Sequence, residues 1–210
     1  MTGRRLLDRV VLQGDSPVVA PRLLGTILER PEEGTAVRII EVEAYDEDDP
    51  ASHTFRGRTA RNAVMFGPAG HAYVYFTYGM HWCMNVVTGP DGHGQAVLLR
   101  AAEVVDGEAV LRARRGDRVR DRDLLRGPAR LASALGIDGA LGGVDLLDPT
   151  SPVQLAEDGF GVPTVATGPR VGVRLAADRP WRFWIEGHPQ VSRYVRHRRA
   201  DESDGTRPGA

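Results

Sequence analysis

The pattern of hydrophobic and polar positions is clearest in two runs of β-branched and aromatic residues, at 73–77 and 82–88. A short segment separates the runs, and its glycine, Gly79, can adopt a positive φ at no steric cost. The spacing therefore predicts a β-hairpin. Tyr78 and Met80 fall at its tip, where polar residues are usual. Two interpretations remain open: another part of the chain covers the tip, or the tip inserts into a partner.

A second informative pattern is the stretch 36–45, which alternates as a β-strand does. Positions 40, 42 and 44 are apolar and suit a core, whereas the intervening face carries Glu41, Glu43 and Tyr45. Two carboxylates and a tyrosine at the end of an apolar strand fit either an exposed sheet face with ordinary charges or an acid–base site.

The remaining elements are shorter or less regular. The long irregular segment 46–69 is of the kind that more often carries function than not. The pattern also predicts a helical turn at 20–25, strands at 26–29, 96–100, 170–175 and 181–186, and helices at 103–115 and from Gly127-Pro128 to about 137. The expected fold is α+β: one domain over 1–197, with a mostly antiparallel curved sheet, flanking helices and a protruding β-hairpin. The polar residues 198–210 are expected to be a disordered tail.

Composition excludes several chemistries. The chain has 210 residues, 41% of them hydrophobic, and a formal charge of -1, so no global basic signal points to nucleic acid. It contains no lysine, and all 27 basic residues are arginine, which excludes Lys Schiff bases, pyridoxal-phosphate anchoring and a P-loop lysine. Eight arginines lie within 112–130, either as a solvated helical face or as an anion-binding surface, since arginine suits bidentate contact with phosphate.

Other candidate sites have little support. The single cysteine, Cys83, rules out an intramolecular disulfide and is expected to be a buried, inert thiol. No segment has the pattern of a signal peptide or a membrane span, so a cytoplasmic, soluble protein is expected. Histidines lack metal-ligand spacing, and neither a nucleophile elbow nor a GxGxxG fingerprint is present. The carboxylate strand, aromatic hairpin and arginines together indicate an enzyme that takes a base out of the nucleic-acid stack and attacks its sugar.

A series of short motifs carries a resemblance. In order they are Glu41-Val42-Glu43-Ala44-Tyr45, Ala51-Ser52-His53, Arg61-Asn62, Met65-Phe66, Tyr73-Val74-Tyr75, Tyr78-Gly79-Met80, Cys83-Met84-Asn85 and Leu98-Leu99-Arg100. This order resembles the alkyladenine (3-methyladenine) DNA glycosylase family of the mammalian type. Gly127-Pro128, the run from Arg170 to Val173 and the strand near Arg182 extend the likeness over most of the chain.

The resemblance implies monofunctional excision of damaged purines from duplex DNA, without cofactor or metal, by a monomer associated with the nucleoid when bound. Glu43 matches the general base that activates water for attack on the sugar C1′, and Arg100 a position beside it. The other matched residues divide between the wall of the base pocket and the part inserted into the duplex. The pocket residues are Tyr45, Ala51, His53, Tyr75, Asn85 and Leu98, with Asn85 matching the group that excludes the 2-amino group of guanine, and the inserted residues are Tyr78 and Met80.

Several alternatives stay open at this point. Spacing alone leaves Glu41 as a rival for the general base, and the tip departs from the mammalian pattern at His81-Trp82. The segment 53–62 is about one residue shorter than in that pattern. A catalytically silent module that binds damaged DNA would use the same inserted tyrosine, Tyr78, and the same arginines. A hydrolase of free nucleosides would need neither. The sequence does not rank 3-methyladenine, hypoxanthine, 7-methylguanine and ethenoadenine as substrates.

Overall fold

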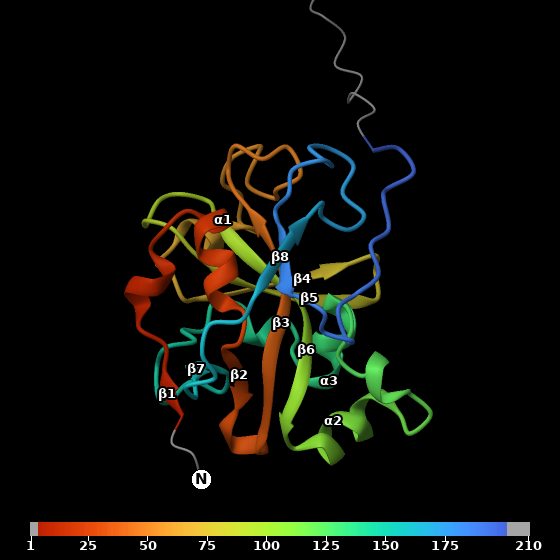
Figure 1. Cartoon of the computed structure of the whole chain (residues 1–210). Helices are drawn as coiled ribbons and strands as arrows, with labels where there is room; N and C mark the ends of the chain where they lie inside the picture. The colour runs from red at the N-terminus through yellow and green to blue at the C-terminus, as the bar shows by residue number, and fades with distance from the viewer. Residues whose placement is uncertain (1–3, 201–210) are drawn as a thin grey trace, which may run out of the picture.

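A single antiparallel sheet organises the molecule. The computed structural model describes residues 4–200, and within them the strands follow the order β1-β7-β2-β3-β6-β5-β4, with β9 on β3 and β8 on β9 (Figure 1). Every pairing is antiparallel. The strands are β1 Arg5–Leu6, β2 Ile27–Arg30, β3 Thr35–Tyr45, β4 Ala72–Thr77, β5 His81–Val87, β6 Ala96–Asp106, β7 Gln154–Glu157, β8 Val165–Gly168 and β9 Arg182–Ile185.

Strand β3 is the centre of this sheet. It pairs with β6 along its length, with β2 at its beginning and with β9 at Glu41–Glu43. Register shifts at Ile39, Glu41 and Val42 interrupt the ladder with β6, and such irregularities bend and twist a sheet. The result is a curled sheet in which both faces of β3 are covered. Glu41 and Glu43 are fully buried, so the exposed-face interpretation of these carboxylates is wrong.

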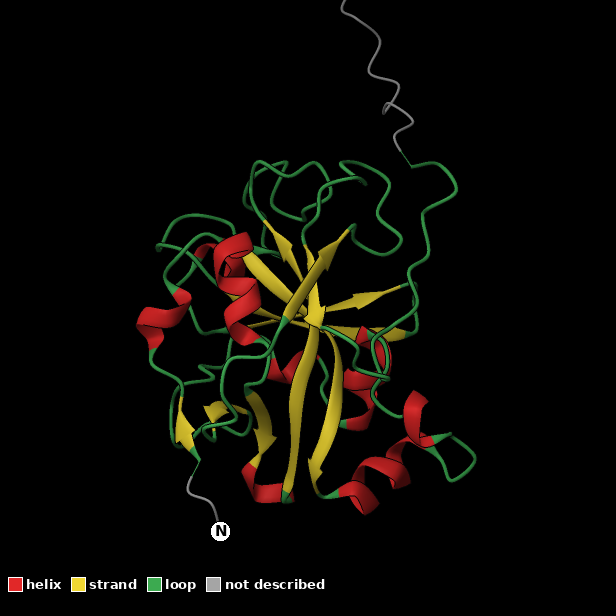
Figure 2. Cartoon of the chain, in the orientation of Figure 1, coloured by secondary structure: helices red, strands yellow, loops and turns green. Residues whose placement is uncertain are grey.

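The helices are short and lie around the sheet (Figure 2). The packing of Leu111 and Leu131 into the main core anchors the two longer helices. The α-helices are α1 Ser16–Val19, α2 Glu108–Arg115 and α3 Pro128–Ala134, and the 3₁₀ turns are η1 Arg9–Leu12, η2 Ala20–Leu23, η3 Pro31–Glu33, η4 Ala63–Phe66, η5 Asp121–Asp123 and η6 Gly139–Leu141. The α+β class and the mostly antiparallel curved sheet are confirmed.

Two predicted elements differ from the structure. The helix predicted at 103–115 is present but begins later, as α2 at Glu108–Arg115. Residues 103–106 continue strand β6 rather than opening a helix, because Val104 still pairs with Val37 of β3. The change to helix comes at Gly107, whose φ is 73° and whose Cβ position would lie 2.5 Å from the Gly34 carbonyl oxygen.

Residues 170–175 form no strand. The alternation of apolar residues there is real, but the backbone N–H of Val171 donates to Glu43 and that of Gly172 to the Val195 carbonyl. Those donors are therefore not available to a neighbouring strand.

The turn between β4 and β5 has an unusual backbone. The Met80 N–H donates to the Thr77 carbonyl at 3.2 Å, and both central residues have positive φ: 52° at Tyr78 and 68° at Gly79. Gly79 adopts this conformation freely, whereas a tyrosine there is strained. The side chain of Tyr78 is 86% exposed and that of Met80 67%. No other part of the chain within residues 4–200 covers the tip.

The ends of the chain bear on two expectations. Residues 198–200 form a turn closed by the Ala200 N–H on the His197 carbonyl. The rest of the predicted tail, 201–210, lies outside the described residues. Across residues 4–200, every helix is too short or too polar to cross a bilayer.

Candidate active site

One pocket of about 550 Å³ gathers most of the residues singled out in the sequence. β3, β4, β6 and the segments 50–53 and 171–175 all contribute to its wall. The predicted site residues in the lining are Glu43, Tyr45, Ala51, His53, Tyr75, Tyr78, Leu98 and Arg100. Pro50, Thr77, Cys83, Pro128 and the run from Val171 to Leu175 complete it. The fold thus brings eight predicted residues, far apart in sequence, to one cavity.

Three donors hold the Glu43 carboxylate at the pocket wall. Its Oε1 accepts the Val171 backbone N–H at 2.7 Å, and its Oε2 accepts the Tyr45 hydroxyl at 2.9 Å and lies 3.2 Å from an Arg100 terminal nitrogen. Burial, and then the charge of Glu43, raise the pKa of Tyr45 well above its ordinary value. The phenol therefore stays protonated and donates to the carboxylate. An oriented carboxylate of this kind is suited to general-base work.

Glu41 occupies a different environment although it lies on the same strand. Its Oε1 accepts from Arg100 Nε at 3.0 Å and from an Arg182 terminal nitrogen at 3.3 Å. Both atoms of Ser192 that can donate also bind it: the backbone N–H at 2.6 Å and the hydroxyl at 2.7 Å. Glu41 is absent from the pocket lining. Its four donors make it a buried structural carboxylate.

Arg100 connects the two carboxylates. Burial lowers the pKa of its guanidinium, but the charges of Glu43 and Glu41 outweigh burial and raise it above the ordinary value. The group is therefore permanently charged and lies between the two carboxylates, and Arg182 is a second positive group beside Glu41. Such a cluster stays buried only while each member keeps its partners.

Aromatic side chains form one side of the pocket. The ring centroids of His53 and Tyr75 lie 4.6 Å apart at an edge-to-face angle of 79°. Behind them Tyr73 contributes its hydroxyl, which lies 2.9 Å from His53 Nδ1. Burial raises the pKa of Tyr75, so its hydroxyl is neutral. The arrangement offers flat apolar faces to a planar ring.

Three further residues have positions that the sequence did not settle. Asn85 is buried and donates its amide to the Tyr73 carbonyl at 3.0 Å; it pairs with Leu98 across the β5–β6 ladder but is absent from the lining. Met80 is likewise outside the lining, on the exposed turn. Cys83 is buried, as expected. Unexpectedly, it also lines the pocket, and burial raises the pKa of its thiol.

A buried ion pair behind the pocket was missed by sequence reasoning. The guanidinium of Arg170 binds both oxygens of Asp49, donates to the Ala44 carbonyl at 3.0 Å and lies 4.7 Å from the Tyr45 ring centroid. Arg170 and Asp49 have fully buried side chains. Asp49 is one of several neighbouring acids, and nothing local distinguishes it. Val171, whose N–H binds Glu43, follows Arg170 directly, so the pair positions the pocket wall.

The arginine-rich stretch 112–130 is largely compensated by acids. Asp123 alone lies within 4.0 Å of four arginines, at 120, 122, 126 and 130. Arg112 pairs with Glu108 and Asp121. The solvated, ion-paired interpretation describes this stretch better than an open anion-binding surface.

A pH dependence follows from His53. Burial, and then the charge of Arg61, lower the pKa of its imidazole below the ordinary value of about 6.5. Below that pH the unfolded chain binds the proton more readily, so this group's contribution to folding stability is complete above about pH 6.5 and is lost as the pH falls toward the folded-state pKa. Urea unfolding between pH 5 and 8 should show a shallower acid-side loss of stability in His53→Gln than in the wild type. Equal slopes in the two proteins would contradict this.

A buried carboxylate held by three donors thus lies beside an aromatic-lined pocket and an exposed aromatic turn. The family model of Methylpurine-DNA glycosylase (MPG) matches residues 10–189. The chain therefore belongs to the methylpurine-DNA glycosylase family, and a glycosylase is an N-glycosyl hydrolase.

Relatives of similar length support the assignment. A protein named "Putative 3-methyladenine DNA glycosylase" from Burkholderia lata is 52% identical over 197 residues, covering 93% of this chain and 92% of that protein. Proteins of the same name from Nocardia farcinica and Mycobacterium bovis are 54% and 49% identical; they cover 89% of this chain, and 90% and 93% of their own lengths. These relatives are bacterial, so the mammalian subtype expected from the motifs is not confirmed.

Proposed function

We propose that this protein is a monofunctional DNA glycosylase that starts base excision repair. It flips alkylated or deaminated purines, such as 3-methyladenine and hypoxanthine, out of duplex DNA and hydrolyses the N-glycosidic bond. The names of the relatives support 3-methyladenine as a substrate. The observation that carries the proposal is the position of Glu43, the carboxylate that lines the pocket while Glu41 is turned away from it.

In this proposal Glu43 acts as general base. It takes a proton from a water molecule that attacks C1′ of the flipped nucleotide, while the purine leaves with the electrons of the glycosidic bond. Val171 and Tyr45 orient the carboxylate, and Arg100 balances its charge. The carboxylate also stabilises the oxocarbenium-like centre that develops on the sugar. The absence of lysine agrees with hydrolysis rather than lyase chemistry, which needs an amine nucleophile.

In this proposal the pocket binds the flipped base, and the turn between β4 and β5 contacts the duplex. Tyr45, His53 and Tyr75 stack on the extruded base, with Ala51 and Leu98 closing the slot, and an electron-poor alkylated purine favours such faces. Tyr78, with Met80 beside it, fills the gap left in the duplex. The exclusion of guanine by Asn85 stays a prediction; what supports it is that its cross-strand partner, Leu98, lines the pocket.

The proposal is tested by single-turnover release of bases from defined DNA. The wild type should release hypoxanthine from an inosine-containing duplex and 3-methyladenine from methylated DNA, as a monomer and without added metal. Tight duplex binding without release of either base would favour a silent damage-binding module. Release from free nucleosides at the same rate as from duplex would favour a nucleoside hydrolase.

Tyr78→Gly tests the role of the Tyr78 ring in DNA binding separately from its effect on folding stability. The substitution removes the aromatic ring and relieves the positive φ, a strain of about 1–3 kcal/mol for a non-glycine residue. We expect binding of inosine duplex to weaken by about 1–3 kcal/mol, the value of one stacking interaction. The free energy of unfolding should be unchanged or higher. Both are measured on the same preparation, by anisotropy and by urea unfolding.

The contrary result is unambiguous. Unchanged duplex binding and excision in Tyr78→Gly would show that the turn does not enter the duplex, and the nucleoside-hydrolase alternative would then gain.

A further inference from the structure

The segment 191–199 is a basic stretch near the C-terminal end of the described residues. It carries four arginines, Arg193, Arg196, Arg198 and Arg199, and no acidic residue, and all four are exposed. It begins just after the residues matched by the family model, which end at 189. Nothing in the site described above uses these arginines.

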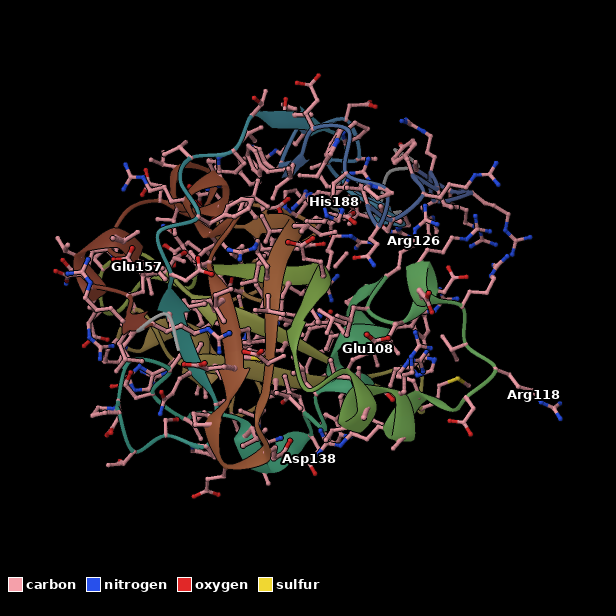
Figure 3. The ribbon with its side chains drawn as sticks, turned by 60° about the horizontal axis from the view of Figure 1, so that its bottom comes forward. Glu108, Arg118, Arg126, Asp138, Glu157 and His188 are labelled. Atoms are coloured by element: carbon pink, nitrogen blue, oxygen red, sulfur yellow. The ribbon has the colours of Figure 1, made fainter. Side chains whose placement is uncertain are left out.

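The backbone of this segment is held in place although it has no regular secondary structure. Arg126 donates to the Val191 carbonyl at 2.8 Å, and Ser192 donates its N–H and hydroxyl to Glu41. Further along, the Val195 carbonyl accepts the Gly172 N–H at 2.9 Å. Figure 3 shows Arg126 close to this end of the chain. A segment fixed at three points loses little conformational freedom when its side chains bind a ligand.

These anchors place the segment beside the candidate active site. Gly172 lines the pocket, one residue after the Val171 N–H that binds Glu43. Glu41, which Ser192 binds, shares Arg100 with Glu43. Arg193 follows Ser192 in the chain, and it is exposed to solvent.

Two of the four arginines have no acidic partner. Arg196 pairs with Asp178 at 2.7 Å, and Arg199 has contacts of its own. Within residues 4–200, Arg193 and Arg198 make no ion pair. Their charge is therefore available to an anion, in contrast to the stretch 112–130, where Asp123 contacts four arginines.

We propose that residues 191–199 form a preformed strap that binds the phosphate backbone of the DNA next to the flipped nucleotide, with Arg193 and Arg198 as the phosphate ligands. This deepens the proposed glycosylase function and rests on it. The exposed guanidinium groups match phosphate oxygens bidentately, and the anchors to Glu41 and the pocket wall set the strap's distance from the scissile bond. The strap contributes charge and position without reading sequence.

The test is the salt dependence of binding to an undamaged duplex, which reports the number of phosphates neutralised. Each lost contact should reduce the slope of log K against log salt by about 0.9. For Arg193→Gln/Arg198→Gln we expect a slope shallower by about 2 and weaker binding at low salt. Arg193→Lys/Arg198→Lys should keep most of the slope, because it keeps the charge.

The matched control is Arg5→Gln/Arg22→Gln, which removes the same charge from exposed positions on β1 and η2. Glu157, the partner of Arg5, lies on the opposite side of the molecule from Arg126 (Figure 3). This control should keep the wild-type slope. An unchanged slope in the strap variant, or an equal loss in the control, would overturn the strap.

A second readout separates the strap from the glycosylase proposal. With enzyme saturating over an inosine duplex, single-turnover release of hypoxanthine by the wild type reports the chemical step apart from the affinity for DNA. If the strap variant has a shallower salt dependence but the wild type never excises a base, the strap proposal is supported and the glycosylase proposal is contradicted. Excision with an unchanged slope would do the reverse.

Discussion

Glu43→Gln should abolish base excision while leaving duplex binding intact. The amide cannot accept the proton of the attacking water, and loss of a positioned general base costs about 10²–10⁴-fold in rate. Gln keeps one oxygen that can accept the Val171 N–H, and its NH2 group can donate to the Tyr45 hydroxyl oxygen where the carboxylate had accepted from it, so the pocket should retain its shape. The measurement is single-turnover release of hypoxanthine from a defined inosine duplex, alongside anisotropy with the same DNA.

Glu41→Gln is the control that the structure provides for this experiment. It removes the charge facing Arg100 and Arg182 in a site with almost no solvent exposure, and breaking such a buried ion pair costs about 3–5 kcal/mol of folding stability. Its defect should therefore appear in urea unfolding, with a smaller loss in the chemical step. If Glu43→Gln excised bases at the wild-type rate and Glu41→Gln did not, the assignment of the general base would move to Glu41.

A large effect on stability is also expected at Arg170. Arg170→Met leaves the fully buried carboxylate of Asp49 without its bidentate partner, with the nearest nitrogen of Arg179 3.8 Å away. We expect a loss of about 3–5 kcal/mol in the free energy of unfolding. Denaturant unfolding at constant m-value measures it.

Two companion variants show whether burial is the cause. Arg5→Gln breaks the exposed pair with Glu157 and should cost no more than about 1 kcal/mol. Asp49→Leu/Arg170→Met removes both buried charges and should recover part of the loss, since an apolar pair avoids the desolvation cost. A loss in Arg170→Met no greater than in Arg5→Gln would mean that the pair does not hold the wall of the pocket.

Local patterns were sufficient for much of the fold. The alternation in 36–45 predicted strand β3, and the two aromatic runs predicted β4 and β5 with a positive φ at Gly79. Such patterns work because side-chain direction in a strand has period two and depends only on neighbouring residues. The same reasoning failed at 170–175, where an apolar alternation was present but the backbone donors bind Glu43 and Val195.

What the sequence determined by itself is chemical and local: no lysine for imine chemistry, a strand with two carboxylates on one face, and an aromatic turn. The tertiary structure decided which carboxylate faces the pocket. Glu41 takes its donors from Ser192, 151 residues away, and Glu43 takes one from Val171, 128 residues away. Periodicity assigns both to the same side of the strand, because it contains no information about partners so distant along the chain. Only the folded chain brings those partners to the strand, and with them the difference between a structural carboxylate and a candidate general base.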